Sequence, residues 1–516
     1  MRLVEELVRG VPVRCYADRP RSIVAVLEDR LGTSGGDVLL IDPALNTQVT
    51  YDAFARLVEG AAAALLARGL QPGDRVAVLL RNGLEAAVAI WACARAGLVH
   101  IGLPTGAPVA RLAELLTLTG PRLVLAQPEL LADARAAAGP VEVAGAELLL
   151  ADEMPWRHGL ARPDEDATYC LIATSGTTGR PKAVRVTGRM TCHAAVFYTG
   201  ALALTAADRT AIHLPFAWVS GHVTQLAPAM LSGGSAVTMA SFSAPELVAV
   251  AQAHDVTWLD VVPSIWELLL RVQAFGRASL PRVRLAVFGG APAPPGTLGR
   301  VRERMPGLEL HDVYALSETC APVTWLADGD DRPGTVGRAA PTCELRLVGP
   351  AGALGEGAGA LGEGAGELEV RGPAVTPGYW GDEPTPLTPD GWLRTGDLAR
   401  IDADGFVTIS GRSVDLLIRG GVNVYPAEVE RALLSTGRLA DAAVVGLPSP
   451  VAGVKIAAAV VLLPGTELDR PALQQAVHDA LGSHAVPRRI RVVAELPRNR
   501  HGKIDRPTVA GLLDPP

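Results

Sequence analysis

The sequence predicts a large α/β domain followed by a smaller α+β domain. The chain has 516 residues, more than the ~100 to 200 usual for one compact domain. Up to about Gly145, short apolar segments alternate with longer Ala- and Leu-rich segments, the order that gives a mostly parallel sheet covered by helices. From Ser410 onward, strands and helices follow in the order of a small α+β domain. We place the boundary near Gly411, which gives domains of residues 1–410 and 411–516.

The first region shows this alternation element by element. Thr50 has the side chain of a helix cap, and the segment after it predicts a helix to Arg68. A Pro-Gly turn then leads into a predicted strand, Gly73–Leu80, followed by a helix, Glu85–Ala96, and a second strand, Gly120–Ala126. We expect this region to be scaffold.

Later segments repeat the pattern. Asp255–Leu270 predicts a strand, a Pro-Ser break and a helix. Arg284–Leu298 predicts a strand that ends at Gly289-Gly290, where a ligand can approach the backbone. An Asp-Gly turn at Asp404 joins two strands, and Pro426 stands in the first turn of a helix.

Composition and charge narrow the classes of function. Hydrophobic residues make up 49% of the chain, and its net charge is −7. The sequence contains no block of basic residues that would follow a nucleic-acid backbone, so we expect no nucleic-acid partner. The start of the chain is charged throughout, unlike a signal peptide, and no segment reaches the ~18 apolar residues of a membrane span. We therefore expect a cytoplasmic protein. As a separate expectation, the protein is either a monomer or a homodimer.

The six cysteines have no spacing typical of a metal site. They are far apart in the sequence and form no CxxC pair. We expect reduced thiols in the core. They are Cys15, Cys93, Cys170, Cys192, Cys320 and Cys343.

The segment Thr174–Val184, TSGTTGRPKAV, has the composition of a phosphate-binding loop after a predicted strand, Thr168–Ala173. Its glycines allow close backbone approach to a ligand, its hydroxyl groups donate hydrogen bonds and its lysine adds a positive charge. These residues are Ser175, Gly176, Thr177, Thr178, Gly179 and Lys182. The combination suits a triphosphate. Pro181 and Ala183 depart from the Walker pattern, and an ordinary polar hairpin loop has a similar composition.

The segment YALSE, Tyr314–Glu318, combines an aromatic ring, a hydroxyl and a carboxylate. For a nucleoside triphosphate, Tyr314 offers a ring that can stack on adenine, Ser317 offers a hydroxyl for the α-phosphate, and Glu318 offers a carboxylate for Mg²⁺, which prefers one or two carboxylates with phosphate oxygens. Taken alone, a Ser beside a Glu is also common where a helix begins.

The segment RTGD, Arg394–Asp397, places a carboxylate after a glycine turn. Asp397 is therefore a candidate for binding both ribose hydroxyls, and Arg412 is a candidate second contact to ribose or phosphate. An aspartate that merely stabilises a turn explains this motif equally well when it is taken alone.

These motifs occur in an order that resembles the adenylate-forming (ANL) superfamily, which includes acyl-CoA synthetases, aryl-acid CoA ligases, peptide-synthetase adenylation domains and luciferases. The resemblance extends over nearly the whole chain, although Ala315 and Ser317 replace the family's usual Gly and Thr. It implies a large AMP-binding domain with parallel-rich sheets covered by helices and a small, mobile C-terminal α+β domain. It also implies ATP and Mg²⁺ as cofactors and a carboxylic acid as substrate.

The resemblance also assigns catalytic residues. PRNRHGKIDR, Pro497–Arg506, is similar to the family element whose lysine bridges the carboxylate and the α-phosphate during adenylation. Lys503 would enter the site for the first half-reaction and leave for the second. Glu318 and Thr174 complete the candidate catalytic set. The alternative is an exposed basic tail without a catalytic role.

The resemblance places nucleotide and acid contacts at the end of the Arg284–Leu298 segment and nearby. The nucleotide set includes Gly289, Gly290 and Ala291, and the acid pocket includes Trp218, His222, Gly289 and Ala315. The pocket is expected to be mainly apolar, which fits a medium acyl chain and an aromatic acid equally well.

The segment Arg419–Glu430, RGGVNVYPAEVE, resembles the element of acyl- and aryl-CoA ligases whose paired glycines line the pantetheine passage. It implies CoA as the acceptor, with Gly420 and Gly421 in contact with it, although paired glycines also serve a simple turn. The alternatives are a stand-alone ligase that passes the adenylate to an acyl carrier protein or another small nucleophile, and a non-catalytic nucleotide-binding protein. The last alternative is disfavoured because the chain retains, together, Lys182, Glu318, Asp397, Arg412 and Lys503.

Three features depart from the family pattern. Val414 occupies the usual hinge position, so Asp415 is the remaining candidate for that task. Trp218 replaces a frequent histidine, and both Trp218 and His222 suit core packing as well as a pocket. The heptapeptide GALGEGA is duplicated over Gly352–Ala365, for which we expect a lengthened, mobile surface hairpin without a function of its own.

Overall fold

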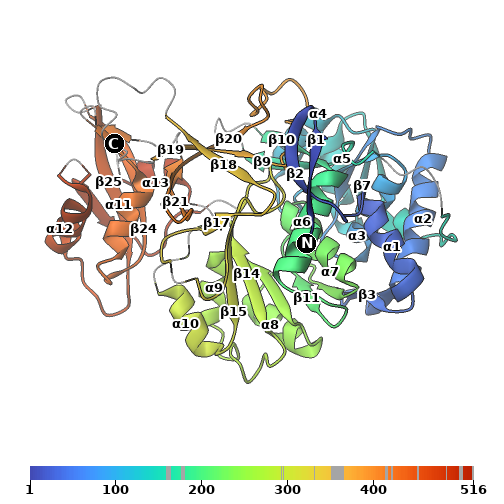
Figure 1. Ribbon diagram of the computed structural model, residues 1–516, viewed down its shortest axis with the longest axis horizontal. Coiled ribbons are helices and arrows are strands. Elements are labelled where there is room, and N and C mark those ends of the chain that lie inside the picture. Colours follow the sequence, from blue (N-terminus) through green and yellow to red (C-terminus); the bar gives the residue numbers. More distant parts are fainter. Residues whose placement is uncertain are drawn as a thin grey trace.

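The structure is a computed structural model, and its described residues form two large sheets, two smaller ones and two short strand pairs (Figure 1). The described ranges are 1–158, 164–175, 181–291, 293, 296–330, 332–349, 365–412, 417–419, 422–449, 453–483, 485–498 and 504–513. Among these residues, no helix combines the length and the apolar character needed to cross a bilayer.

The first large sheet consists, in spatial order, of β10 (Pro181–Thr187), β9 (Thr168–Ser175), β6 (Val99–Gly102), β5 (Arg75–Leu79), β7 (Leu123–Ala126) and β8 (Glu142–Gly145). Its neighbouring strands are parallel except for β10, which pairs antiparallel with β9. The outer face packs against α4 (Val109–Thr119) and α5 (Leu131–Ala138). Two short 3₁₀ helices also belong to this region, η1 (Pro128–Leu130) and η2 (Ala146–Leu149).

The second large sheet consists, in order, of β17 (Arg338–Ala339), β16 (Thr324–Leu326), β15 (Glu309–Tyr314), β14 (Leu285–Gly289), β13 (Trp258–Val261), β11 (Arg209–Ile212), β12 (Ser235–Thr238), β3 (Val38–Asp42) and β4 (Thr47–Thr50). From β15 to β3 it is parallel. Three helices pack against its outer face: α8 (Ala244–Ala253), α9 (Pro263–Leu270) and α10 (Thr297–Arg304).

One hydrophobic cluster joins the inner sides of both large sheets. It contains residues of α1 (Ile23–Ser34), α2 (Tyr51–Ala67), α3 (Leu84–Arg95), α6 (Gly188–Ala201) and α7 (Ala227–Ser232). The helices therefore form a layer between the sheets. Thr50 caps α2 as expected, because its hydroxyl accepts a hydrogen bond from the Ala53 N–H at 3.2 Å.

A four-stranded antiparallel sheet follows, built from β18 (Glu344–Val348), β19 (Ala365–Arg371), β20 (Leu393–Ile401) and β21 (Val407–Arg412). The predicted strand pair around Asp404 is β20–β21. The strands on either side of the duplicated heptapeptide, β18 and β19, pair antiparallel, whereas the heptapeptides lie outside the described residues except for Ala365.

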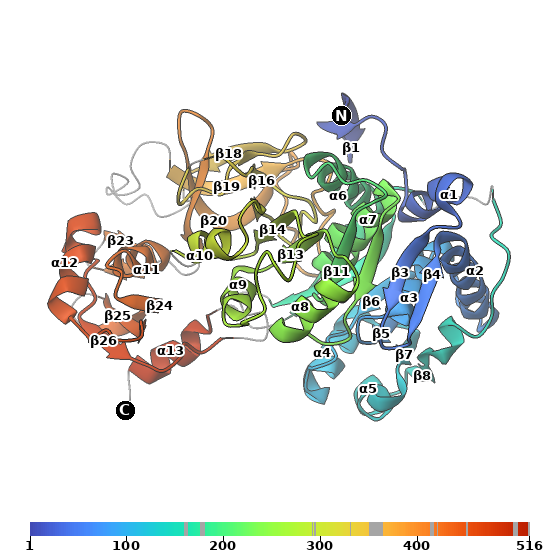
Figure 2. The same cartoon turned by 90° about the horizontal axis from the view of Figure 1, so that it is seen from below.

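The C-terminal elements form a lobe at one end of the molecule (Figure 1 and Figure 2). They are β22 (Leu417–Arg419), β23 (Val422–Val424), α11 (Pro426–Leu434), β24 (Leu439–Ser449), β25 (Gly453–Leu462), α12 (Arg470–Leu481), β26 (Arg489–Val492) and α13 (Arg506–Leu513). α11 and α12 share one core with the sheet β24-β25-β26, and α13 packs on its other face. The predicted fold class is confirmed, while the boundary at Gly411 stays a prediction.

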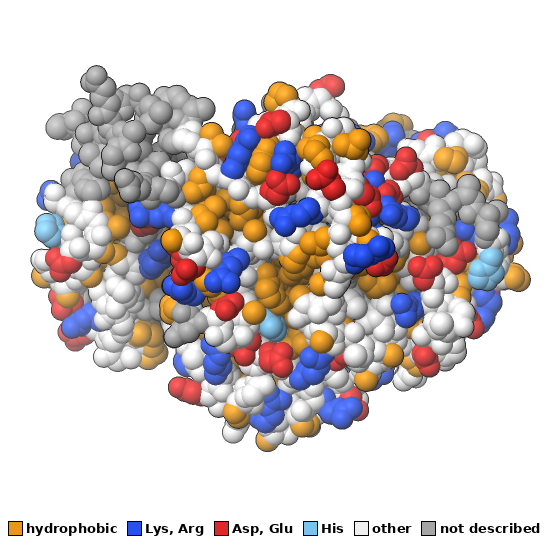
Figure 3. Space-filling model, viewed as in Figure 1, with side chains coloured by type: hydrophobic (Ala, Val, Ile, Leu, Met, Phe, Trp, Pro, Cys, Tyr) orange, Lys and Arg blue, Asp and Glu red, His pale blue; other side chains and the backbone are white. Residues whose placement is uncertain are grey.

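The six cysteine thiols are free and buried, as expected. Burial raises the pKa of Cys93, Cys192 and Cys343 to about 12, so these thiols stay protonated near neutral pH. On the face drawn in Figure 3, side chains of both charge signs are interspersed, and hydrophobic side chains are exposed along the middle of the view.

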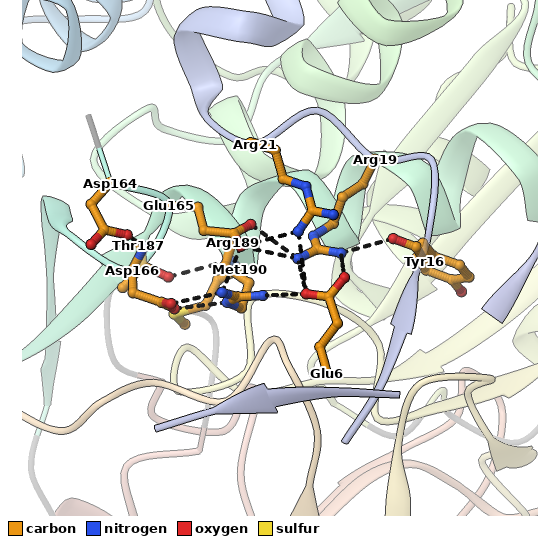
Figure 4. Close-up of polar contacts among 10 residues, drawn as sticks. All are labelled: Glu6, Tyr16, Arg19, Arg21, Asp164, Glu165, Asp166, Thr187, Arg189 and Met190. Carbon is orange, nitrogen blue, oxygen red and sulfur yellow. Dashed lines mark hydrogen bonds and ion pairs between the residues drawn. The ribbon is translucent and has the colours of Figure 1, made fainter. Parts of the chain in front are cut away.

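A buried ion network ties the N-terminal hairpin, β1 (Leu3–Val8) and β2 (Val11–Tyr16), to the base of the β9–β10 hairpin (Figure 4). Arg19 is paired with Glu6 at 2.7 Å and with Glu165 at 3.0 Å. Arg189, at the start of α6, is paired with Glu165 at 2.6 Å and with Asp166 at 2.7 Å. Asp166 precedes β9 and Arg189 follows β10, so the network fixes both ends of the hairpin that carries the candidate phosphate-binding loop.

Candidate functional site

The hairpin β9–β10 positions Lys182 at the start of β10, opposite the carboxyl end of β9. Lys182 on β10 lies directly opposite Thr174 on β9, and both are partly exposed. The Lys182 Nζ atom lies 3.5 Å from Glu383 Oε2 and 4.6 Å from the centre of the Tyr379 ring. The ammonium therefore has a carboxylate and an aromatic face as neighbours, a geometry suited to a cation.

Residues 376–383 form a segment that sequence reasoning missed. Its backbone pairs with β10: the Arg185 N–H donates to the Gly378 carbonyl at 3.1 Å, and the Trp380 N–H donates to the Ala183 carbonyl at 2.8 Å. The segment has no helical or strand period, and only its Pro-Gly-Tyr turn composition signals it in the sequence. Pairing with β10 places Tyr379 and Glu383 beside Lys182.

Tyr379 also links this hairpin to Glu318. Its hydroxyl donates a hydrogen bond to Glu318 Oε1 at 2.9 Å, and the Thr376 N–H donates to the Glu318 carbonyl at 2.8 Å. Glu318 and Lys182, which are distant in sequence, therefore share Tyr379 as a neighbour. The structure brings together two of the residues that the motifs singled out.

The segment Tyr314–Glu318 leaves β15 as a tight turn. The Thr319 hydroxyl accepts a hydrogen bond from the Leu316 N–H at 3.1 Å, and the Cys320 N–H donates to the Leu316 carbonyl at 3.1 Å. No helix begins here in the part of the chain that the structure describes, so the simple helix-start explanation of this motif is wrong. The turn leaves Ala315, Ser317 and Glu318 partly exposed.

Tyr314 and Asp397 are in direct contact. The Tyr314 hydroxyl donates to Asp397 Oδ2 at 2.5 Å, and Asp397 is buried on β20 opposite the backbone of Arg412 on β21. The expected turn at RTGD is instead a bulge within β20, because the pairing with β19 shifts there and Gly396 has a φ of 71°. Glycine tolerates that conformation, and the bulge aims Asp397 at Tyr314.

The end of β14 is shaped by its glycines. A side chain on Gly289 would lie 2.3 Å from the Val313 carbonyl oxygen, so only glycine lets β14 and β15 approach this closely. Gly290 follows with a φ of 80°, and both Gly290 and Ala291 are exposed. The backbone is therefore accessible at the end of β14, and the approach of a ligand to it stays a prediction.

Trp218 and His222 differ in their surroundings. Trp218 is partly exposed ahead of a π-helix, η3 (Ser220–Leu226), a type of helix frequent at functional sites. His222, within η3, is fully buried and its ring meets Tyr169 edge-on at 6.3 Å. Burial lowers the pKa of His222 to about 4, so its ring is neutral near pH 7.

Asp312 is a second residue that the motifs did not indicate. It precedes Tyr314 by two residues on β15, so both side chains lie on the same face of the sheet. Burial raises the pKa of Asp312 to about 7. The signal in the sequence is weak, because the strand LELHDVY also contains Glu309 and His311, so Asp312 does not stand out as a lone polar residue.

Comparison with known proteins places this geometry in a family. The family model described as AMP-binding enzyme matches residues 27–380, and the model described as AMP-binding enzyme C-terminal domain matches residues 428–503. The chain belongs to the AMP-binding enzyme family. The predicted membership of the adenylate-forming enzymes is thereby confirmed.

Relatives of this AMP-binding enzyme are CoA ligases. The chain is 33% identical over 482 residues to a sulfoacetate–CoA ligase of Cupriavidus necator, covering 90% of this chain and 93% of that protein. It is 31% identical over 484 residues, with the same coverage, to an indoleacetate–CoA ligase of Aromatoleum aromaticum. The prediction of an enzyme of the AMP-forming acyl-CoA synthetase kind is therefore confirmed, including the use of ATP and CoA.

Solved structures of similar proteins agree. ATP-bound MatB from Rhodopseudomonas palustris superposes with a TM-score of 0.86 at 27% identity, covering 96% of this chain and 100% of that one. The o-succinylbenzoate CoA synthetase of Bacillus subtilis, solved with ATP and a magnesium ion, gives a TM-score of 0.81 at 28% identity, covering 93% and 98%.

Several predicted site residues of this AMP-binding enzyme lie outside the described residues, so their roles stay predictions. The structure describes the backbone but not the side chains of Ser175 and Arg412. The residues outside are Gly176, Thr177, Thr178, Gly179, Val414, Asp415, Gly420, Gly421 and Lys503.

Proposed function

We propose that this enzyme activates a small carboxylic acid with MgATP and transfers the acyl group to CoA. The acid's carboxylate attacks the α-phosphorus of ATP, the bond to the leaving pyrophosphate breaks, and an acyl-adenylate forms. The CoA thiolate then attacks the acyl carbon and releases AMP. The observation that supports this most directly is the convergence of Lys182, Glu318 and Tyr379, which puts a cation and a carboxylate beside the loop proposed to bind phosphate.

Lysine usage supports a phosphate-binding role for one lysine and a catalytic role for another. The chain contains three lysines, Lys182, Lys455 and Lys503, and its other residues with permanent positive side chains are arginines. Two of the three stand in proposed site segments, Lys182 in the phosphate-binding segment and Lys503 in the catalytic one. Lysine offers a compact charge on a flexible stem, which arginine does not replace at a site that needs a point charge. We infer that Lys182 binds the phosphates and Lys503 the α-phosphate and the acid's carboxylate.

Glu318 fits a role as the magnesium ligand. Its carboxylate accepts one hydrogen bond, from Tyr379, and it forms no ion pair with the residues that the structure describes. Among those residues no group of three or more His, Cys, Asp or Glu side chains suits a metal ion. A cation here would depend on one carboxylate with phosphate oxygens and water, the arrangement Mg²⁺ prefers. When bound, it would neutralise phosphate charge.

The nucleoside would lie between β15 and β20. Tyr314 would stack on adenine, with its hydroxyl held by Asp397, and the Asp397 carboxylate would accept hydrogen bonds from the ribose hydroxyls. Asp312, on the same face as Tyr314, would accept a hydrogen bond from the adenine amino group. Ser317 and Thr174 would contact the α-phosphate.

CoA is the acceptor that the relatives support, and we propose that it passes Gly420 and Gly421. Trp218 and Ala315 would border the acid, with His222 as the buried support behind Trp218. The small C-terminal domain, residues 411–516, would carry Lys503 into the site and out again. An acyl carrier protein stays the alternative acceptor.

The test is pyrophosphate release from MgATP with a panel of aliphatic and aromatic acids, each measured with and without CoA. Release that requires one acid class and increases with CoA supports the proposal. Acid-dependent release that is indifferent to CoA would direct the search to a carrier protein, and no release with any acid would refute the ligase.

Lysine variants give the matched control. We expect Lys503→Arg and Lys182→Arg each to lower kcat/KM by at least about 100-fold, the loss typical for one electrostatic contact to a reacting group. Lys455→Arg changes the remaining lysine, which is exposed on β25, and should leave activity unchanged. Equal effects of the three variants would contradict the assigned roles.

A further inference from the structure

Asp260 is a carboxylate in the middle of the second large sheet. It lies on β13, between β14 and β11, and the Thr224 hydroxyl of η3 donates to its Oδ2 atom at 2.5 Å. No described cation pairs with it, and burial raises its pKa to about 7. An uncompensated carboxylate in a sheet core is costly, so its presence points to a function rather than to stability.

Asp260 nevertheless keeps some exposed surface, although its strand neighbours Leu259 and Val261 are buried. Thr224 occupies one carboxylate oxygen, and no other described side chain donates to the carboxylate. The carboxylate therefore borders an accessible space on the side of the sheet covered by η3 and α6. Tyr198 of α6 lies near it, since burial and then the Asp260 charge raise the pKa of Tyr198.

Strand register relates this space to the end of β14. Asp260 pairs with Val287, which precedes Gly289 by two residues. Side chains two residues apart lie on the same face of a strand, so Asp260 lies on the Gly289 face about 7 Å below the strand end. Gly289 belongs to the acid pocket that the family resemblance implies. An acid whose carboxylate binds beside Gly289 therefore reaches Asp260 with its far end.

We infer that Asp260 is a specificity-determining residue, and that the acid carries an N–H or O–H donor about 7 Å from its carboxylate. This inference rests on the proposed function. It replaces the expectation of a mainly apolar pocket by a pocket with one acceptor at its far end. Thr224 orients the carboxylate, and the second oxygen binds the donor of the acid.

The alternative is a purely structural Asp260 that serves only as a partner for Thr224. An asparagine or a second hydroxyl would satisfy Thr224 without a buried charge. A further donor would stabilise the charged carboxylate of Asp260, whereas an apolar substrate would favour its protonated form.

The experiment compares acids of equal shape that differ in one end group. One series is 4-(aminomethyl)benzoate, 4-(hydroxymethyl)benzoate and 4-ethylbenzoate, and the other is 5-aminopentanoate, 5-hydroxypentanoate and hexanoate. Pyrophosphate release gives kcat/KM for each acid. In at least one series, the wild-type enzyme should prefer a donor acid over the apolar acid by about tenfold or more, and the better of the two donors distinguishes an ammonium from a hydroxyl substrate.

Variants at Asp260 test the cause of the preference. Asp260→Asn keeps the shape and the contact with Thr224, and it should lower kcat/KM for an ammonium acid by about 10- to 100-fold. Asp260→Leu should reverse the order in favour of the apolar acid. Thr224→Val should weaken the preference for donor acids, because it removes only the hydroxyl that orients the Asp260 carboxylate. Thr238→Val, a buried change in β12 of the same sheet, is the control and should leave the order unchanged.

Two failures are distinguishable. If the wild-type enzyme activates the apolar acids best and Asp260→Leu keeps that order, the inference about Asp260 is refuted while the ligase stands. If no acid of either series releases pyrophosphate but another acid of the wider panel does, the predicted donor position is refuted. If no acid at all is activated, the proposed function is refuted, and this inference with it.

Discussion

Replacing Arg189 by methionine should destabilise the large domain. The guanidinium makes two hydrogen bonds to the Asp166 carboxylate, both at 2.7 Å, and pairs with Glu165 and Glu6 at 2.6 Å and 3.2 Å. Its side chain is 6% exposed. Removing one partner of a buried network costs about 3–5 kcal/mol. The Asp166 side chain is 35% exposed, and Glu165 retains its ion pair with Arg19 in the variant. We therefore expect the loss of stability to lie at the lower end of this range, about 3 kcal/mol.

Denaturant unfolding followed by tryptophan fluorescence measures this loss. The last of the eight tryptophans is Trp392, so all of them lie within the predicted large domain, residues 1–410, and the signal reports on that part of the chain. Arg2→Met is the matched control, because Arg2 pairs with Asp18 at 2.9 Å but the two side chains are 70% and 73% exposed. Such a pair contributes at most about 1 kcal/mol.

Acid dependence gives a second readout of the same network. Hydrogen bonds from Arg189 hold the pKa of Asp166 below its usual value, and those from Arg19 hold the pKa of Glu6 well below its own. A carboxyl group with a lowered pKa stabilises the fold above its unfolded pKa, and this contribution is lost as the pH falls through the folded value. The wild-type domain should therefore lose stability below about pH 4, and Arg189→Met should lose less. The reasoning is refuted if Arg189→Met and Arg2→Met unfold at the same denaturant concentration and with the same acid dependence.

Two further predictions concern the site. Tyr314→Phe removes the hydroxyl that donates to Asp397, so the KM for ATP should rise by about tenfold while the KM for the acid stays unchanged; equal changes in both constants would contradict the nucleoside assignment. Glu383→Gln removes the carboxylate 3.5 Å from Lys182, which frees the ammonium for phosphate, so the KM for ATP should fall by up to about fivefold. A rise in that constant would show that Glu383 supports binding instead.

Local patterns predicted the elements well where the signal was periodic or capped. Thr50 and the run after it indicated α2, and Arg470–Leu481 is the observed α12. The regular spacing of apolar residues along an element can be read from one segment of the sequence, without knowledge of the elements that it packs against. The candidate residues Tyr314, Asp397, Lys182 and Glu318 were singled out because their motifs, in this order, resemble those of the adenylate-forming enzymes, and their roles stay predictions.

The partners of these residues could not be found in the same way. Tyr379 and Glu383 reach Lys182 only because an irregular segment pairs with β10 in three dimensions. The bulge at Gly396 depends on pairing with β19, which no local propensity encodes. Asp260 lies inside an apolar strand, and only the register with β14 relates it to the strand end where we propose that the acid binds.

The contacts of Lys182 suggest why the site can be assembled before its ligand binds. The proposed phosphate-binding lysine is held by Glu383 and Tyr379, and Tyr379 in turn holds Glu318. The pair of Lys182 and Glu383 is partly exposed, so breaking it costs no more than about 1 kcal/mol. A charge-assisted hydrogen bond from Lys182 to a phosphate contributes about 1.5–3 kcal/mol of favourable free energy. Exchanging the carboxylate for a phosphate is therefore favourable, and Tyr379 keeps Glu318 in position while the exchange occurs.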